Sequence, residues 1–452
     1  MLQRDAISGS PDIHGATIAW VVATIVTLPL LGVILGGRAI HPYLEFPPIT
    51  RSVTHEPFSG IVFIQVAVLI VVILVPFLAR VVRTTRQESR PPMERFPWWG
   101  WLAVLWTLIA WLLAWTRFEW MQSLQAHTFT PLWLGYIVLV NALTYRRTGR
   151  CMLLHRPRYV LSLFPLSACF WWFFEYLNRF VQNWHYVGGG ELSAWEYLVR
   201  ATLPFSTVLP AVLGTAEWLS SFPRLSAGLD RFVTFEFKNH TTWGWGLLIG
   251  SAVGLFGIGL WPDYLFSLVW VAPLLLITSL QLIRDEPTIF SGTAQGDWRT
   301  LWAAALAALI CGWFWEMWNF YSLARWEYAV PFVQRFKLFE MPLLGYAGYL
   351  PFGLECLAVA DLSLSRKFSG GVAYYRAAEG GTDIAIMNGG SIRIDDELPT
   401  GPVTEYDVIR VLPFGGNVVS LTMGGSLLAR VLDVGVTNQG TGGFLHAYGV
   451  TR

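Results

Sequence analysis

The sequence predicts an all-α polytopic membrane bundle of about ten transmembrane helices with a parallel internal repeat, followed by a small α+β domain. Charged residues make up 13% of the chain and hydrophobic residues 54%, against roughly 25% and 45–50% in soluble proteins. About ten apolar runs reach the roughly 20 residues that cross a bilayer. From about residue 366 onward the sequence is polar and punctuated by glycine, as in a folded soluble domain.

The expected membrane segments are joined mostly by short connections. The first has about 22 apolar residues and follows a polar N-terminal stretch, so it is too long for the apolar region of a cleaved signal peptide. The seventh and eighth are separated only by the tight re-entry "PDY". The expected segments lie near residues 16–37, 60–79, 97–116, 129–146, 159–181, 200–221, 243–262, 264–283, 300–322 and 341–362.

The arginines predict how this bundle is oriented. The connections 80–96 and 146–158 each carry five arginines, and they lie on the same side if the helix count is right. By the positive-inside rule, these connections, the N-terminus and the C-terminal tail are cytoplasmic, whereas one miscounted helix would reverse the side of the tail. We therefore expect a multi-pass protein of the cell membrane, with the lipid bilayer as a partner. The formal net charge of +1 gives no reason to expect nucleic acid as a partner.

The membrane part contains an internal repeat. The segments "WFFEYLNRFVQNWHY" (172–186) and "WFWEMWNFYSLARWEY" (313–328) share a glutamate, an asparagine three residues later and then Trp-x-Tyr. The two copies are four helices apart in this count, on the fifth and ninth expected helices, so both run in the same direction, and a site is expected between them near the bilayer midplane. The equivalent residues are Glu175, Asn178, Trp184, Tyr186, Pro210 and Glu217 in the first copy, and Glu316, Asn319, Trp326, Tyr328, Pro351 and Glu355 in the second.

The repeated polar residues have two interpretations. A charged residue at the centre of a spanning helix costs roughly 2.5–3.5 kcal/mol, so it faces the bundle interior with a partner. Either the Glu–Asn pairs are hydrogen-bonded clamps between helices, or the glutamates form a catalytic cluster that acts on a substrate or a proton. The surrounding aromatic residues are expected to pack, and no cofactor is predicted. The catalytic candidates are Glu175, Glu316, Glu217 and Glu355.

The repeated pattern resembles the lycopene cyclase domain of carotenoid synthesis, over residues of roughly 130–220 and 264–362. That family has an intramembrane acid-x-x-Asn, then Trp-x-aromatic, then a helix entered through proline and followed by one or two glutamates, and tandem domains occur in it. The resemblance implies that the glutamates donate protons in a carbocation cyclisation of an apolar isoprenoid. The first acid of that family is usually aspartate, and its Pro-x-Glu-Glu is not reproduced here.

The C-terminal segment is expected to form the small α+β domain. "DIAIMN", "NVVSLTM" and "GFLHAYGV" read as strands, and "VTEYDVIRVL" and "SLLARVLDVGV" read as helices opened by Thr404 and Ser426. The expected regions are an N-terminal three-helix region at 1–128, membrane repeats at 129–262 and 263–365, and this domain at 366–452.

The C-terminal segment is similar to the C-terminal domain of bacterial 5′-nucleotidases, because "DIAIMNGGSIR", "LPTGPVTEYDVIRVLPFGGNVVSLTMGGSLLARVLD" and "GTGGFLHAYGV" occur in the family's order. In that family this domain binds the nucleoside, and a separate metallophosphatase domain with two metal ions cleaves the phosphate. The resemblance implies substrate contacts from Arg393, from the backbone of Asn388, Gly389 and Gly390, from Phe414 stacking on the base, and from Asn417. An aromatic ring that stacks on a base contributes roughly 1–3 kcal/mol.

Three features depart from that family. No GNHE-like or GHxH-like run precedes the segment and the eight histidines are scattered, so no metal site is predicted. "PFGGN" has one glycine more than the family's shorter form. The chain ends two residues after the last expected strand, where the family's domain continues to a second stacking aromatic, so we expect a truncated domain or a fused gene product.

The combined prediction is an integral membrane protein that carries a nucleotide-binding module of the 5′-nucleotidase family, a hydrolase family of nucleotide catabolism. It is expected to be inactive on nucleotides by itself, unless a metallophosphatase domain acts in trans. The alternative is a membrane enzyme or carrier for an apolar isoprenoid-type substrate that uses the repeated glutamates. A purely structural membrane scaffold is the third interpretation.

Overall fold

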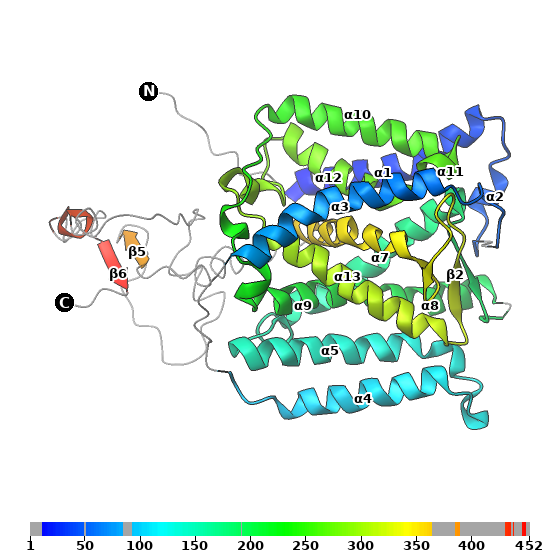
Figure 1. Ribbon diagram of the computed structural model, residues 1–452, viewed down its shortest axis with the longest axis horizontal. Coiled ribbons are helices and arrows are strands. Elements are labelled where there is room, and N and C mark those ends of the chain that lie inside the picture. Colours follow the sequence, from blue (N-terminus) through cyan, green and yellow to red (C-terminus); the bar gives the residue numbers. More distant parts are fainter. Residues whose placement is uncertain are drawn as a thin grey trace. The chain divides into compact units, whose positions relative to one another are not determined.

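The computed structural model describes residues 11–48, 51–84, 93–190 and 192–363, together with 385–388, 430–434, 437 and 445–448. The chain divides into two compact units, Met1–Leu364 and Ser365–Arg452. The first unit is a bundle of long helices (Figure 1). They are α1 (Pro11–Leu35), α3 (Gly60–Arg83), α4 (Trp98–Trp115), α5 (Phe129–Thr148), α7 (Pro157–Val181), α8 (Ala194–Phe205), α9 (Val208–Ser220), α10 (His240–Ile258), α12 (Ala272–Ile283) and α13 (Arg299–Phe320), with a further helix at 349–363.

Short elements join these helices at their ends. Single helical turns form α2 (His41–Leu44), α6 (Met152–His155) and α11 (Pro262–Leu265). Two small sheets belong to the same unit. They are built from β1 (Trp184–Val187) with β2 (Arg325–Tyr328), and from β3 (Lys337–Leu338) with β4 (Met341–Pro342).

The expected number of apolar helices is confirmed. Within the described ranges, nine helical segments are long and apolar enough to cross a membrane, and the bent pair Pro262–Trp270 and Ala272–Ile283 makes up to ten. The segment expected as one span at 264–283 is broken by a bend of 58°. Pro273 lies in the first turn of α12, where a missing N–H costs no hydrogen bond, so a new helix begins there.

Glycines allow α1 and α10 to cross closely. Gly32 and Gly36 lie four residues apart at the end of α1, and Gly259 follows the last residue of α10. A Cβ atom on Gly32 would collide with the carbonyl oxygen of Phe256, and one on Gly259 would collide with that of Pro29. Such contacts between small residues let helix backbones approach closely in membrane proteins.

Helix α9 lies inside the bundle, where it packs against α5, α7 and α13 and has most of its residues buried. Helix α4 packs along α5 at one edge of the bundle (Figure 1). Helix α3 has no buried residue along its length, although its sequence is strongly apolar. A lipid environment would cover such a surface.

The second unit contains a two-stranded antiparallel sheet, in which β5 (Ala385–Asn388) pairs with β6 (Leu445–Tyr448). Residues 430–434 are helical. These positions confirm the expected first strand, last strand and second helix of the domain. The expected helix at 403–412 and strand at 417–423 lie outside the described residues.

Candidate functional site

The two copies of the repeated segment meet in one small sheet. Strands β1 and β2 pair antiparallel, with Trp184 opposite Tyr328 and Tyr186 opposite Trp326. Strand β2 lies at the end of the bundle that also holds α2, α8 and α11 (Figure 1). The Trp-x-Tyr strand of one copy therefore pairs with the Trp-x-Tyr strand of the other. The tryptophan of each strand lies opposite the tyrosine of its partner strand, which is the arrangement that a two-fold axis between the strands produces.

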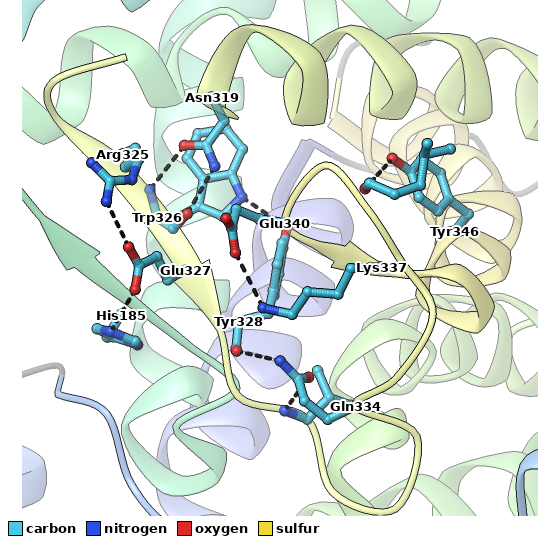
Figure 2. A network of polar contacts seen from close by, with 12 residues as sticks. His185, Asn319, Arg325, Trp326, Glu327, Tyr328, Gln334, Lys337, Glu340 and Tyr346 are labelled. Carbon is cyan, nitrogen blue, oxygen red and sulfur yellow. Dashed lines mark hydrogen bonds and ion pairs between the residues drawn. The ribbon is translucent and has the colours of Figure 1, made fainter. Parts of the chain in front are cut away.

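The two asparagines hold these strands against their helices. Asn178 donates from Nδ2 to the Trp184 carbonyl oxygen at 2.8 Å and accepts at Oδ1 from the backbone N–H groups of Asn183 and Trp184 at 2.8 and 3.3 Å. Asn319 bonds both the N–H and the C=O of Trp326 at 2.8 Å (Figure 2). Each side-chain amide thus bonds its strand as a neighbouring backbone would, so the asparagines hold the strands to the ends of α7 and α13.

In the first copy, one oxygen of Glu175 collects three hydrogen bonds. Oε1 accepts from the indole N–H groups of Trp171 and Trp184 at 3.1 and 3.2 Å and from the Tyr186 hydroxyl at 2.5 Å. The other oxygen, Oε2, is buried and has no hydrogen-bond partner among the described residues. The side chain is only 1% exposed.

In the second copy, Glu316 has the same division between its two oxygens. Oε1 accepts from the hydroxyls of Tyr328 and Tyr349 at 2.8 and 2.7 Å, and Trp326 donates to the Tyr328 oxygen at 2.9 Å. Its Oε2 is buried with no partner in the described part of the chain. Tyr349 packs directly over Gly312, where a Cβ would collide with the tyrosine ring.

A packed aromatic cluster separates the two carboxylates. Phe352 is fully buried, and its ring lies 5.9 Å from that of Trp171 and 6.2 Å from that of Trp315. Trp171 bonds Glu175, and Trp315 precedes Glu316 in the sequence. The rings of Trp171 and Trp315 are themselves 6.5 Å apart, so aromatic packing rather than a direct contact joins the two sites.

The two glutamates lie near the ends of their helices. Glu175 is six residues before the end of α7, and Glu316 is four residues before the end of α13, which corresponds to roughly 9 and 6 Å along the axes. Both glutamates therefore lie nearer the ends of their helices than the centres, and the expected place of the site near the bilayer midplane stays a prediction.

Glu355 lies deeper, near the middle of the helix at 349–363. It is fully buried, and neither carboxylate oxygen has a hydrogen-bond partner within the described ranges. The backbone of Leu274, in the first turn of α12, lies close to this carboxyl group but does not reach hydrogen-bond geometry.

Glu217 does not join the site of the first copy. Its Oε2 accepts from the backbone N–H of Met152 at 3.0 Å, the first residue of α6, which lies five residues before α7 begins at Pro157. Glu175 lies 18 residues further along α7, roughly 27 Å away along the helix axis. Glu217 and Glu355, which are loosely equivalent in the sequence repeat, therefore do not occupy equivalent positions in the structure.

A rim of charged residues surrounds the strand pair (Figure 2). Glu327 pairs with Arg325 at 2.8 Å and approaches His185 of the opposite strand at 3.7 Å. Lys337 pairs with Glu340 at 3.2 Å. These pairs are partly exposed, so each contributes little to stability, but together they make this end of the bundle polar.

The tyrosines of the strands are protonated hydrogen-bond donors. Burial, and then the neighbouring carboxylates, raise the pKa of Tyr186 and of Tyr328 well above the ordinary value of a phenol. Each phenol therefore keeps its proton and donates it to a glutamate oxygen. The arrangement fixes one oxygen of each glutamate and leaves the second oxygen as the position where a proton or a substrate group can be exchanged.

Two donors were not among the predicted residues. Trp171 lies four residues before Glu175 on one helix face, a spacing that indicates side-chain contact. Tyr349 comes from a different helix, and nothing in its sequence shows that it reaches α13.

No group of three or more histidine, cysteine, aspartate or glutamate side chains that could hold a metal occurs in the described part of the chain. In the second unit, Asn388 is the last residue of β5. The other predicted nucleoside contacts lie outside the described residues: Gly389, Gly390, Arg393, Phe414 and Asn417.

Comparison with known proteins identifies the second unit. Residues 365–452 match the family model described as 5'-nucleotidase, C-terminal domain. No curated protein and no solved structure shows significant similarity to the chain. The match confirms the resemblance of the motifs from "DIAIMNGG" to "GGFLHAYG". Residues 365–452 are therefore a C-terminal domain of the 5′-nucleotidase family.

Proposed function

We propose that the chain is a multi-pass membrane protein whose C-terminal domain binds the nucleoside part of a nucleotide. The family match over residues 365–452 carries this proposal, and the apolar helices support the membrane placement. Arg393 and the backbone of the "NGG" turn contact sugar or phosphate oxygens. Phe414 stacks on the base, and Asn417 hydrogen-bonds it. Phosphate cleavage belongs to a metallophosphatase domain acting in trans.

Calorimetric titration of the purified chain with adenosine and AMP tests this proposal. Binding is expected for both, with loss of affinity in Phe414→Ala and Arg393→Ala. A parallel phosphate-release assay with added divalent cations is expected to show no release by the purified chain alone. If neither ligand binds, the nucleoside-binding proposal fails; release that survives purification would contradict the assignment of cleavage to a separate domain.

The same proposal places the C-terminal domain in the cytoplasm. Arg95 lies close to Arg146 in the chain's fold, because the neighbouring Glu94 donates its backbone N–H to the Arg146 carbonyl oxygen at 2.8 Å. With ten crossings, the tail leaves the bilayer on this arginine-rich side. Protease digestion of sealed inverted vesicles is expected to remove the tail, and protection in those vesicles would contradict the placement.

A second candidate function belongs to the membrane unit. Glu175 and Glu316 each have one oxygen held by donors and one buried oxygen without a partner in the described ranges. A general acid needs a fixed orientation and an oxygen that can carry a proton to the substrate. This geometry, together with the resemblance to lycopene cyclase domains, supports action on an apolar isoprenoid-type substrate.

The test compares Glu175→Gln and Glu316→Gln with Glu217→Gln as the matched control. Proteoliposomes are supplied with an acyclic isoprenoid polyene, and products are separated by chromatography. Conversion is expected in the parent chain and in the control, with loss in the two site variants at unchanged helicity. Full conversion by both site variants would remove this candidate.

A further inference from the structure

The break before α12 lies inside the bundle. The helical pair Pro262–Trp270 and Ala272–Ile283 is bent by 58°, and Val269 and Ala272, on either side of the break, are 0% and 1% exposed. In membrane proteins, an interrupted helical backbone is found where it is buried in protein or lines a cavity. The broken helices of transporters bind substrates and coupling ions at such interruptions. The break before α12 is therefore a candidate binding position.

The first turn of α12 has no cap of its own. Val271, the residue before the helix, makes no capping hydrogen bond with its apolar side chain, and Pro273 has no N–H. The N–H of Leu274 has no backbone acceptor among the described residues. The first N–H groups of a helix have no partners within the helix and form its positive end, so they stabilise a negative charge placed beside them.

Glu355 brings a carboxyl group to this position from another helix. The carboxyl group lies close to the backbone of Leu274. The side chain is 0% exposed, and neither oxygen has a hydrogen-bond partner within the described ranges. A capping side chain ordinarily accepts from the N–H of the second or third residue of its helix, and Leu274 is the third residue of α12. Glu355 therefore lies beside the N–H that a capping oxygen would bind, but the bond is not made.

The surroundings of Glu355 offer no counter-charge. No charged side chain in the described part of the chain pairs with it, and its titratable neighbour is the thiol of Cys356, which in turn interacts with that of Cys311 on α13. Phe352, one turn earlier on the same helix, is fully buried, and its ring lies 6.1 Å from that of Trp270 at the break. An isolated carboxylate in such an apolar place is far more costly than a neutral carboxyl group, so the neutral form is favoured.

We propose that Glu355 and the first turn of α12 form a proton-binding site. In the closed bundle the carboxyl group is neutral and holds the proton. When the proton passes to water, only the O–H bond breaks and its electron pair stays on the oxygen. The carboxylate then accepts a hydrogen bond from the Leu274 N–H, and the positive end of α12 replaces the missing counter-charge. The site is separate from the nucleoside-binding domain and from Glu175 and Glu316.

Infrared difference spectroscopy of the full chain in liposomes tests the proposal, because the C=O stretch of a protonated carboxyl group is distinct from the bands of a carboxylate. Subtracting the spectrum of Glu355→Gln from that of the parent chain at neutral pH is expected to leave one protonated-carboxyl band, which shifts in D2O because its proton exchanges. Glu217→Gln is the matched control and should retain this band. A carboxylate band in its place, or a band that D2O does not shift, would overturn the proposal.

A titration of the same band with pH separates proton binding from two other outcomes. The band is expected to decrease reversibly as the pH rises, and to be the same in sodium chloride and in choline chloride at equal concentration. Loss of the band on adding sodium ions at constant pH would show that a metal cation occupies the site, which contradicts the proposal. A band that stays constant at every pH at which the helical circular dichroism signal is retained would show a permanently neutral packing group, which also contradicts it.

Two variants of Leu274 test the role of α12. Leu274→Pro removes the N–H, and proline is tolerated in the first turn of a helix. Because the carboxylate of Glu355 then has no donor, the midpoint of the band's titration is expected to rise by roughly one to two pH units, as for the loss of one hydrogen bond to a charged group. Leu274→Ala is the control, because it keeps the N–H, and its midpoint should stay near that of the parent chain. Equal midpoints in the two variants would refute the Leu274 N–H as the donor.

Discussion

Replacing Asn319 with alanine is expected to destabilise the bundle by about 2–6 kcal/mol. The Asn319 amide bonds both the N–H and the C=O of Trp326 at 2.8 Å, and the side chain is 1% exposed. The substitution leaves these two backbone groups without partners in a buried place. Each such group costs about 1–3 kcal/mol, and the sum of the two gives the expected range.

Equilibrium unfolding in mixed micelles of increasing dodecyl sulfate content, followed by the helical circular dichroism signal, measures this change. Asn178→Ala removes three hydrogen bonds to the first strand and is expected to cost at least as much. Asn183→Ala is the control, because Asn183 is buried beside the same strand but its Oδ1 has no partner among the described residues. A change below about 1 kcal/mol in Asn319→Ala would show that the amide does not hold the strand in the way the hydrogen bonds indicate.

Three further predictions follow from other parts of the bundle. Gly32→Ala should destabilise the chain by about 1–3 kcal/mol, because the added methyl group collides with α10. Gly250→Ala is the control and should be neutral or stabilising, because the added methyl group meets open space. Equal effects of the two substitutions in unfolding titrations would contradict the close crossing of α1 and α10. Glu355→Met should stabilise the chain by about 1–3 kcal/mol, because it removes a buried carboxyl group that has no hydrogen bond in the described ranges. A lower unfolding midpoint in the variant than in the parent chain would contradict this prediction. Burial raises the pKa of Cys151 to about 11. Because only the thiolate reacts, the rate of its alkylation by iodoacetamide, followed by mass spectrometry, should rise about tenfold per pH unit from pH 8 to about pH 11. A rate that levels off near pH 9 would contradict the raised pKa.

Much of the helical bundle could be predicted from the sequence, because long apolar runs are a direct consequence of bilayer thickness. The break at 264–283 was missed because hydropathy does not detect a bend. Pro273 lies one residue inside the second helix, a position that is compatible with a straight segment as well as with a new start. The short connection 206–207 between α8 and α9 was hidden in the same way by continuous apolar composition.

The site could be predicted only in part. The spacing of Glu175 and Asn178, and of Glu316 and Asn319, identified the polar residues of each copy, but their partners depend on tertiary contacts. Sequence spacing does not reveal that the Trp-x-Tyr strands pair with each other, or that Tyr349 reaches Glu316 from another helix. The motifs of the C-terminal domain identified its family directly, because they are specific in both order and residue type.

The pairing of β1 with β2 has a consequence for assembly. Tyr186 and Trp326 are opposite each other in the sheet but 140 residues apart in the chain, and closing a loop of that length costs roughly 4 kcal/mol. The free energy gained from four residue pairs is not much larger than this cost of loop closure. The sheet therefore forms only once the rest of the bundle has brought α7 and α13 together. Because Tyr186 and Tyr328 reach their glutamates from these strands, the two sites depend on the same strand pair. Tyr349 also bonds Glu316, so during synthesis the hydrogen bonds of both sites are complete only once the chain has passed residue 349.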